Sequence, residues 1–153
     1  MRRWLMSAGW AAACAAAAGS AWAIDNPDAP DRIADFVQRA SPFEQSLGAT
    51  DGGRAAATAG EAYARFLDAE MNRSYQALLA QLDTAPRKAL VESQRRWLAF
   101  RDAELVFMAR QWTRERNGSS ATLSLAGHRA ALLRARVLSL LAYRAEYADA
   151  PRR

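Results

Sequence analysis

The chain has 153 residues, of which 51% are hydrophobic and 24% are charged, and this composition suits one globular domain with a modest core. Its 21 basic and 16 acidic residues give a net charge of +5, so the protein is basic. A single cysteine and a single histidine exclude a disulfide-rich scaffold and disfavour a transition-metal site built from these residues.

Residues 1–23 have the pattern of a secretory signal peptide. Two arginines precede an alanine-rich run that ends in Ala-Trp-Ala, with small residues at the two positions that a signal peptidase reads. A permanent membrane anchor is the alternative, because the run approaches the roughly 20 apolar residues that span a bilayer. Alanine is only weakly hydrophobic and a charged stretch follows, which favours cleavage after Ala23 and a periplasmic or secreted protein. Membrane contact is then expected only through an uncleaved signal peptide.

Residues 24–57 read as an acidic arm and linker. One short amphipathic helix is predicted around Ile33, Phe36, Val37 and Ala40, and Pro42 is expected to end it. The glycine-rich stretch that follows, "GATDGGRAAATAG", is expected to be a flexible linker because its small residues bury little surface.

Residues 58–148 show helical spacing throughout, and residues 149–153 form a short tail. Three helices are predicted, over about residues 58–82, 86–117 and 121–148, with breaks at a proline and at an Asn-Gly pair. No strand pattern competes with these helices. The sequence therefore predicts an all-α fold, an antiparallel three-helix bundle with a long middle helix. The apolar stripe of the first helix contains Tyr63, Leu67, Met71, Ser74, Tyr75, Leu78 and Leu82, and that of the third helix contains Leu123, Ala126, Ala130, Leu133, Val137, Leu140 and Leu141.

The middle helix carries polar residues in the centre of its apolar face. At about 100° per residue, Gln94 and Arg101 share one sector with Trp97 and the apolar residues of the stripe. An unpaired buried charge is costly, so Arg101 needs an acceptor, and Asp68 or Glu70 on the first helix could supply a carboxylate. Two interpretations stay open: an interior polar network that sets how the helices align, or the lining of a ligand site.

Catalytic and nucleic-acid-binding patterns are scarce. His128 is the only histidine, and no nucleophile motif accompanies it. Asp68 and Glu70 could act as an acid–base pair, but carboxylates beside a helix stripe more often serve arginines. The arginines are spread over three helices without interleaved aromatic residues, which argues against nucleic-acid binding. We therefore expect a protein that is not an enzyme and that needs no cofactor or metal.

Three segments resemble the LprI-like family of lysozyme inhibitors. They are "DAEMNRSYQALL" from Asp68, "LVESQRRWLAFRDAE" from Leu90, and "HRAALL" from His128. The residues that match the family pattern are Asp68, Glu70, Asn72, Tyr75, Gln94, Trp97, Phe100, Arg101, Asp102 and Arg129.

The resemblance implies an exported, non-enzymatic helical protein of the cell envelope, in some relatives tied to the inhibition of lysozyme. Family members usually carry cysteines where this chain has Leu105 and Ala121, so the resemblance implies a divergent member whose presumed bridge is replaced by packing. The expected partner is lysozyme or another envelope protein. The alternative is a structural or protein-interaction module of the envelope without lysozyme activity.

One loop has chemistry that suits contact with a partner, although a plain turn between helices would explain it as well. Inhibitors of glycosidases commonly place a loop in the cleft that holds the catalytic carboxylates. The sequence from Arg114 to Ser120, "RERNGSS", offers guanidinium and hydroxyl groups for such a cleft. The residues of this candidate loop are Arg114, Arg116, Asn117, Ser119 and Ser120.

Overall fold

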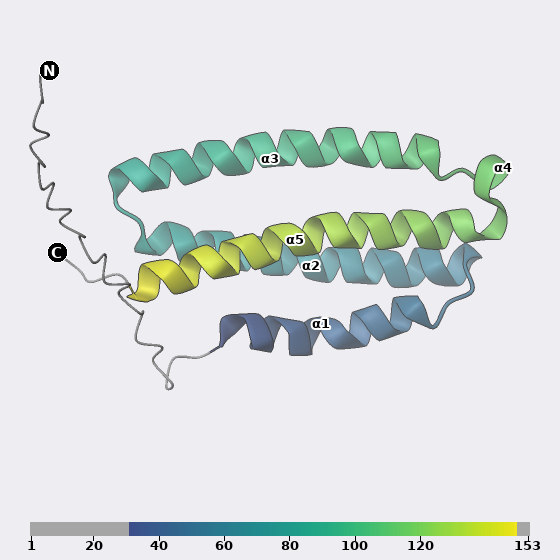
Figure 1. The fold of residues 1–153 in the computed structure, drawn as a ribbon, viewed down its shortest axis with the longest axis horizontal. Coiled ribbons are helices and arrows are strands. Elements are labelled where there is room, and N and C mark those ends of the chain that lie inside the picture. Colours follow the sequence, from purple (N-terminus) through teal and green to yellow (C-terminus); the bar gives the residue numbers. More distant parts are fainter. Residues whose placement is uncertain (1–30, 150–153) are drawn as a thin grey trace, which may run out of the picture.

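The computed structural model describes residues 31–149, and within this range it contains helices and no strand (Figure 1). This confirms the predicted all-α fold class. The expected signal peptide and the last residues of the tail lie outside the described residues. The elements are α1 (Arg32–Gly48), α2 (Gly53–Gln81), α3 (Thr84–Gln111), α4 (Arg114–Asn117), the 3-10 helix η1 (Gly118–Ser120) and α5 (Ala121–Asp149).

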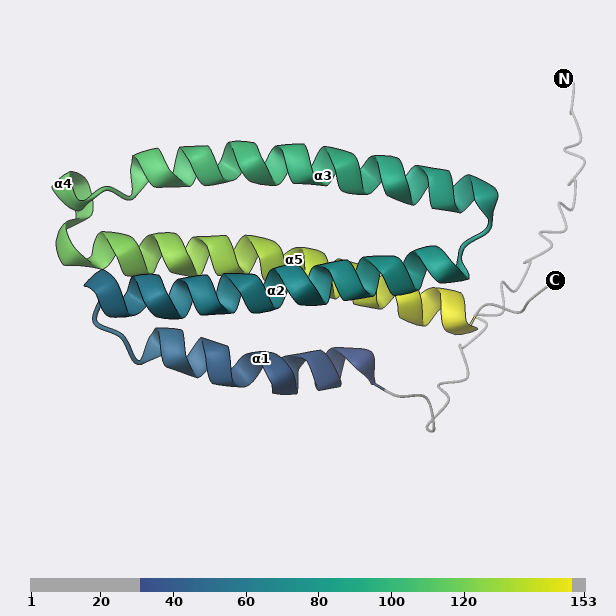
Figure 2. The same cartoon turned by 180° about the vertical axis from the view of Figure 1, so that it is seen from behind.

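Helices α2 and α5 run parallel to each other through the centre of the bundle and make its most extensive contact. Helix α1 covers one side of this pair and α3 covers the other, and both run in the opposite direction (Figures 1 and 2). The three predicted helices correspond to α2, α3 and α5. Helix α1 adds a fourth long helix that packs against both α2 and α5.

Helix α1 corrects the interpretation of residues 24–57 as mainly irregular. The Asp31 carboxylate caps its first turn by accepting hydrogen bonds from two backbone amides. The helix then continues through Pro42 to Gly48, so the prediction that Pro42 ends it is wrong. Proline removes a backbone donor and crowds the preceding turn, but side chains before and after it are buried against the central pair. Tertiary packing therefore outweighs the local cost of the proline.

The glycine-rich stretch is mostly helical and not a flexible linker. Helix α2 begins at Gly53, before the predicted start at Thr58, and the connection from α1 is short. Gly52 has φ of 111°, a conformation that residues with a side chain rarely adopt. This glycine lets the chain reverse direction between α1 and α2.

The core lies between α1, α2 and α5. The predicted stripes of α2 and α5 are buried in it, except that Tyr75, Leu123 and Ala126 are half-buried and pack against its edge. Phe36 of α1 is completely buried and belongs to a row of stacked rings with Phe43, Tyr63 and Phe66. The ring centroids of Phe43 and Phe66 are 4.6 Å apart, the closest spacing in the row. Helix α1 is therefore part of the hydrophobic core.

Helix α3 is attached more loosely. It ends at Gln111, so its predicted extension to Asn117 is wrong, and its 28 residues make it no longer than α2 or α5 with 29 each. Only Leu90, Gln94 and Met108 of α3 are buried. The hydrophobic side chains of α3 that stay exposed are Val91, Phe100, Val106 and Phe107.

Candidate functional site

Gln94 lies inside the bundle, as its place on the helix predicted, and joins α3 to α5. Its side-chain oxygen accepts hydrogen bonds from Nε of Arg136 at 3.0 Å and from Nη2 at 2.8 Å. The Trp97 ring lies 5.7 Å from the guanidinium carbons of both Arg101 and Arg136. Burial lowers the pKa of Arg136, and the bonds to Gln94 compensate for part of its lost hydration. Arg136 was not among the predicted site residues.

Arg101 lies at the edge of the interior, where 22% of its side chain is exposed. Its nearest acceptor is Asp102 on the same helix, at 2.7 Å from Nη2. Asp68 of α2 is more distant, with Oδ1 lying 3.9 Å from Nη1. That oxygen is buried and has no hydrogen-bond partner among the described residues. Arg101 therefore links α3 to α2 only through a long ion pair, whereas at the other end of α3 Arg87 donates a 2.7 Å hydrogen bond to the Leu79 carbonyl of α2.

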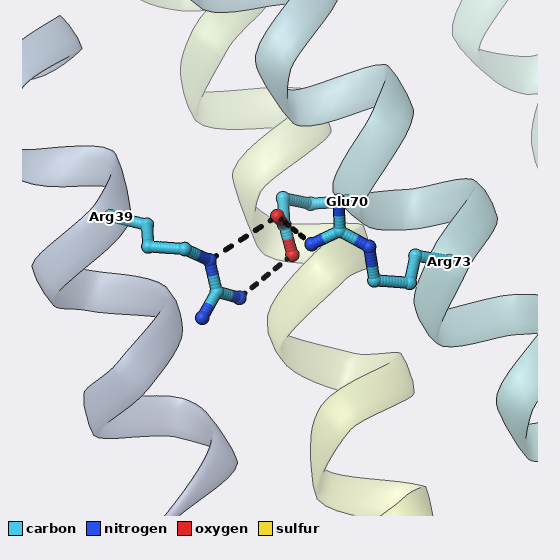
Figure 3. Close-up of polar contacts among 3 residues, drawn as sticks. All are labelled: Arg39, Glu70 and Arg73. Atoms are coloured by element: carbon cyan, nitrogen blue, oxygen red, sulfur yellow. Dashed lines mark hydrogen bonds and ion pairs between the residues drawn. The ribbon is translucent and has the colours of Figure 1, made fainter.

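Glu70 does not pair with Arg101. Its carboxylate is buried, with 4% of the side chain exposed, and it lies between Arg39 of α1 and Arg73 of its own helix (Figure 3). Arg39 approaches both carboxylate oxygens, at 3.4 Å from Nε and 3.0 Å from Nη2. The ion pair between Arg39 and Glu70 therefore joins α1 to α2, and its carboxylate is almost completely shielded from water. The sequence reasoning missed Arg39 because it treated residues 24–57 as separate from the bundle.

Two further arginines on α5 complete the links between helices. Arg129, the family-motif residue of the third predicted helix, pairs with Glu61 of α2. Arg134 lies 3.0 Å from the Glu44 carboxylate of α1, which also accepts a 2.6 Å hydrogen bond from the Tyr63 hydroxyl. Each neighbouring pair of long helices thus has at least one polar link besides its apolar contacts.

The remaining motif residues lie outside these links. Asn72 is exposed, and Tyr75 is half-buried and packs against the core cluster. Asp102 is exposed except for its contact with Arg101. The motif therefore combines residues that join helices with residues that face solvent.

The predicted partner-binding loop forms α4 and η1, and all its residues from Arg114 to Ser120 are exposed at one end of the bundle (Figure 1). It is nevertheless an ordered turn. The Ser120 hydroxyl donates a 2.8 Å hydrogen bond to the Asn117 carbonyl. Gly52, in the α1–α2 turn, approaches the Ser119 carbonyl so closely that a Cβ atom would clash with it.

The base of this loop is held by aromatic packing. The rings of Trp112 and His128 have centroids 4.1 Å apart, and they connect the end of α3 to the first turns of α5. His128 thus lies beside a tryptophan at the root of the loop. Among residues 31–149, no group of three or more histidine, cysteine or acidic residues is placed to hold a metal ion.

The fold and these contacts define an all-α bundle in which most of the motif's charged residues join helices to one another. The chain belongs to the LprI family of lysozyme inhibitors: the family model described as "Lysozyme inhibitor LprI" matches residues 48–140. The match runs from the last residue of α1 to within α5. No curated protein and no solved structure matches the chain. Over the described residues, no helix combines the length and the apolar character needed to cross a membrane.

Proposed function

We propose that this protein is an exported inhibitor that binds lysozyme and is not itself an enzyme. The match of residues 48–140 to a lysozyme-inhibitor family carries the proposal. The placement of the motif residues supports it, because Glu70, Gln94 and Arg129 are engaged in contacts between or within helices. Such residues set the shape of the bundle, and the contact with lysozyme then falls to its surface.

We assign the contact to the α4–η1 loop. Arg114 and Arg116 are exposed, and the loop stands at one end of the molecule, where it can enter a cleft without hindrance from the long helices (Figure 1). Lysozyme clefts hold a pair of carboxyl groups, which arginine can bind in a bidentate manner. Contacts with Gly52 and the Trp112–His128 stack hold the loop in one conformation, which lowers the entropy lost on binding.

The test is an assay of cell-wall lysis by lysozymes of several classes, with increasing amounts of the purified protein. We expect inhibition of at least one class, weakened about tenfold or more in the double variant Arg114→Glu, Arg116→Glu, because the introduced carboxylates would face those of the cleft. The matched control is Arg87→Glu, Lys88→Glu, which makes the same charge change at the opposite end of α3. Absence of inhibition at large molar excess would remove the proposed activity. If both double variants weaken inhibition equally, the loop is not the surface that binds lysozyme.

Export is a separate part of the proposal and rests on the sequence of residues 1–23. Cleavage after Ala23 would release a protein that begins at Ile24. Mass spectrometry of the protein recovered from the periplasm or the medium tests this directly. A full-length protein found in the cytoplasm would contradict it.

A second candidate function is that of an interaction module of the envelope without lysozyme activity. The exposed side chains Phe100, Val106 and Phe107 on α3 favour it, since each is more than half accessible to solvent. Cross-linking in envelope extract with the parent and with Phe100→Ser, Phe107→Ser tests it. A partner captured by the parent and lost in the variant, with no effect on lysozyme, would favour this function over inhibition.

A further inference from the structure

A cavity of about 270 Å³ lies between α2, α3 and α5, near the α4 end of the bundle. Its walls are mostly apolar, and they include Gly60 of α2, Leu105 and Ala109 of α3, and Leu125 of α5. Gly60 allows α2 to approach Ala126 of α5 so closely that a Cβ atom would clash with the alanine. The small residues that bring α2 and α5 together thus leave space beneath α3.

One cation lines this cavity. Arg129 uses Nη1 to contact the Glu61 carboxylate, and both residues are part of the wall. Its Nε atom is buried and has no hydrogen-bond acceptor among the described residues. A buried donor without an acceptor is unfavourable. The Nε and Nη2 atoms of an arginine form the edge that binds a carboxylate through two parallel hydrogen bonds, and Glu61 does not use that edge.

We propose that this cavity binds a small amphiphilic carboxylate, with the hydrocarbon chain between α2, α3 and α5 and the carboxylate on Arg129. In this proposal, the half-buried Arg129 side chain rotates so that its unused edge meets the bound carboxylate. A cavity of about 150 Å³ holds a benzene molecule, so the larger volume here suits a chain of about eight carbons. The site is separate from the α4–η1 loop and does not depend on lysozyme binding.

The experiment uses the full chain and three probes at equal ionic strength: sodium octanoate, 1-octanol and sodium acetate. Isothermal titration calorimetry measures the affinity, and thermal unfolding reports stabilisation by mass action. We expect octanoate to bind and raise the unfolding temperature, 1-octanol to bind about tenfold more weakly, and acetate to have no effect. Equal affinity for octanoate and 1-octanol, or an equal effect of acetate, would overturn the proposal.

Three variants locate the site. Ala109→Trp fills the cavity from α3 and is expected to abolish octanoate binding, whereas Ala99→Trp places the same ring on α3 outside the cavity and should leave binding intact. Arg129→Gln should lower the affinity for octanoate to that for 1-octanol without changing the latter. Circular dichroism confirms that each variant is folded. Full octanoate affinity in a folded Ala109→Trp or Arg129→Gln protein would overturn the proposal.

Discussion

Helices α1 and α3 flank the same central pair, yet they are held in different ways. Helix α1 buries Phe36, Ala40 and Leu47, and its ring stack with α2 is continuous. Helix α3 has 28 residues against the 17 of α1, but it also buries three side chains, and one of them is a glutamine. Helix length therefore does not decide which helix contributes more to the core.

The ion pairs that attach α1 and α3 to α2 also differ, and the pair on the α1 side is the more buried. On the α1 side, Glu70 is almost fully buried between two arginines. On the α3 side, 44% of the Asp68 side chain is exposed, and its Oδ1 atom lies 3.9 Å from Nη1 of Arg101. Charge pairs gain strength as water is excluded. We therefore expect α1 to be fixed to the central pair and α3 to yield first when the bundle is perturbed.

Replacement of a core ring on α1 should give the largest effect. Phe36→Ala removes a completely buried side chain from the ring stack, and the expected loss is about 3–5 kcal/mol in the free energy of unfolding. Phe100→Ala on α3 is the matched control, because its ring is 51% exposed, and it should change stability by less than about 0.5 kcal/mol. Urea unfolding monitored by circular dichroism measures both. Similar losses in the two variants would contradict the difference between the helices.

Removal of both arginines around Glu70 should give the next largest effect. The double variant Arg39→Met, Arg73→Met leaves a buried carboxylate without a partner, and the expected loss is about 2–3 kcal/mol. Addition of Glu70→Gln removes the stranded charge and should restore more than half of that loss. The same urea experiment measures it. A double variant as stable as the parent would show that water or another group reaches Glu70.

The buried Tyr63 hydroxyl, which contacts α1 through Glu44, should make the free energy of unfolding depend on pH in the alkaline range. Burial and the hydrogen bond to Glu44 raise the pKa of Tyr63 above its usual value of about 10. Because the folded state holds the proton more tightly, this contribution is fully present below the unfolded pKa and is lost as the pH rises through the folded pKa. Tyr63→Phe should cost about 1 kcal/mol at neutral pH.

The measurement is the urea midpoint of parent and Tyr63→Phe from neutral pH to about pH 11. The gap between the two proteins should narrow as the pH rises above about 10. Tyr147, which is 45% exposed, supplies the control as Tyr147→Phe, with no comparable gap. A gap that is constant with pH would contradict the role of the Tyr63 proton.

The helical period was sufficient to predict the buried stripes of α2 and α5 and the inward position of Gln94. The prediction for α1 and the following turn was wrong, because it considered only the local cost of Pro42 and the flexibility of the glycine-rich stretch. Burial of Phe36 and Leu47 against the following helix, α2, and against α5 outweighs both. Local propensity is a weak guide where tertiary packing is extensive.

The polar partners were harder to predict than the buried positions. A helix wheel places Gln94 inside but cannot choose among the arginines of α5, because the choice depends on the axial offset between the helices. Close contacts between helices, such as that of Gly60 on α2 with Ala126 on α5, are likewise not encoded in the helical period. The period also cannot choose between Asp68 and Glu70 as the acceptor for Arg101, and the partner of Glu70, Arg39, lies on a helix that the sequence pattern does not join to the bundle.

The link between α2 and α3 should give the smallest effect, and it tests whether Arg101 specifies the fold. Arg101→Met removes a long ion pair and one face of the Trp97 contact, so the expected loss is about 0.5–1 kcal/mol. If the arginine serves to neutralise Asp68, the double variant Arg101→Met, Asp68→Asn should be more stable than the single variant. Asp102→Asn in the Arg101→Met background is the control, because Asp102 is on the exposed side of α3.

If the Arg101→Met single variant and the double variant with Asp68→Asn are equally stable, Arg101 does not serve an interior polar network. The residue would then act through Trp97 and Asp102 on α3 alone. The polar links that hold α3 to the described bundle would then be those of Gln94 with Arg136 and of Arg87 with the Leu79 carbonyl of α2.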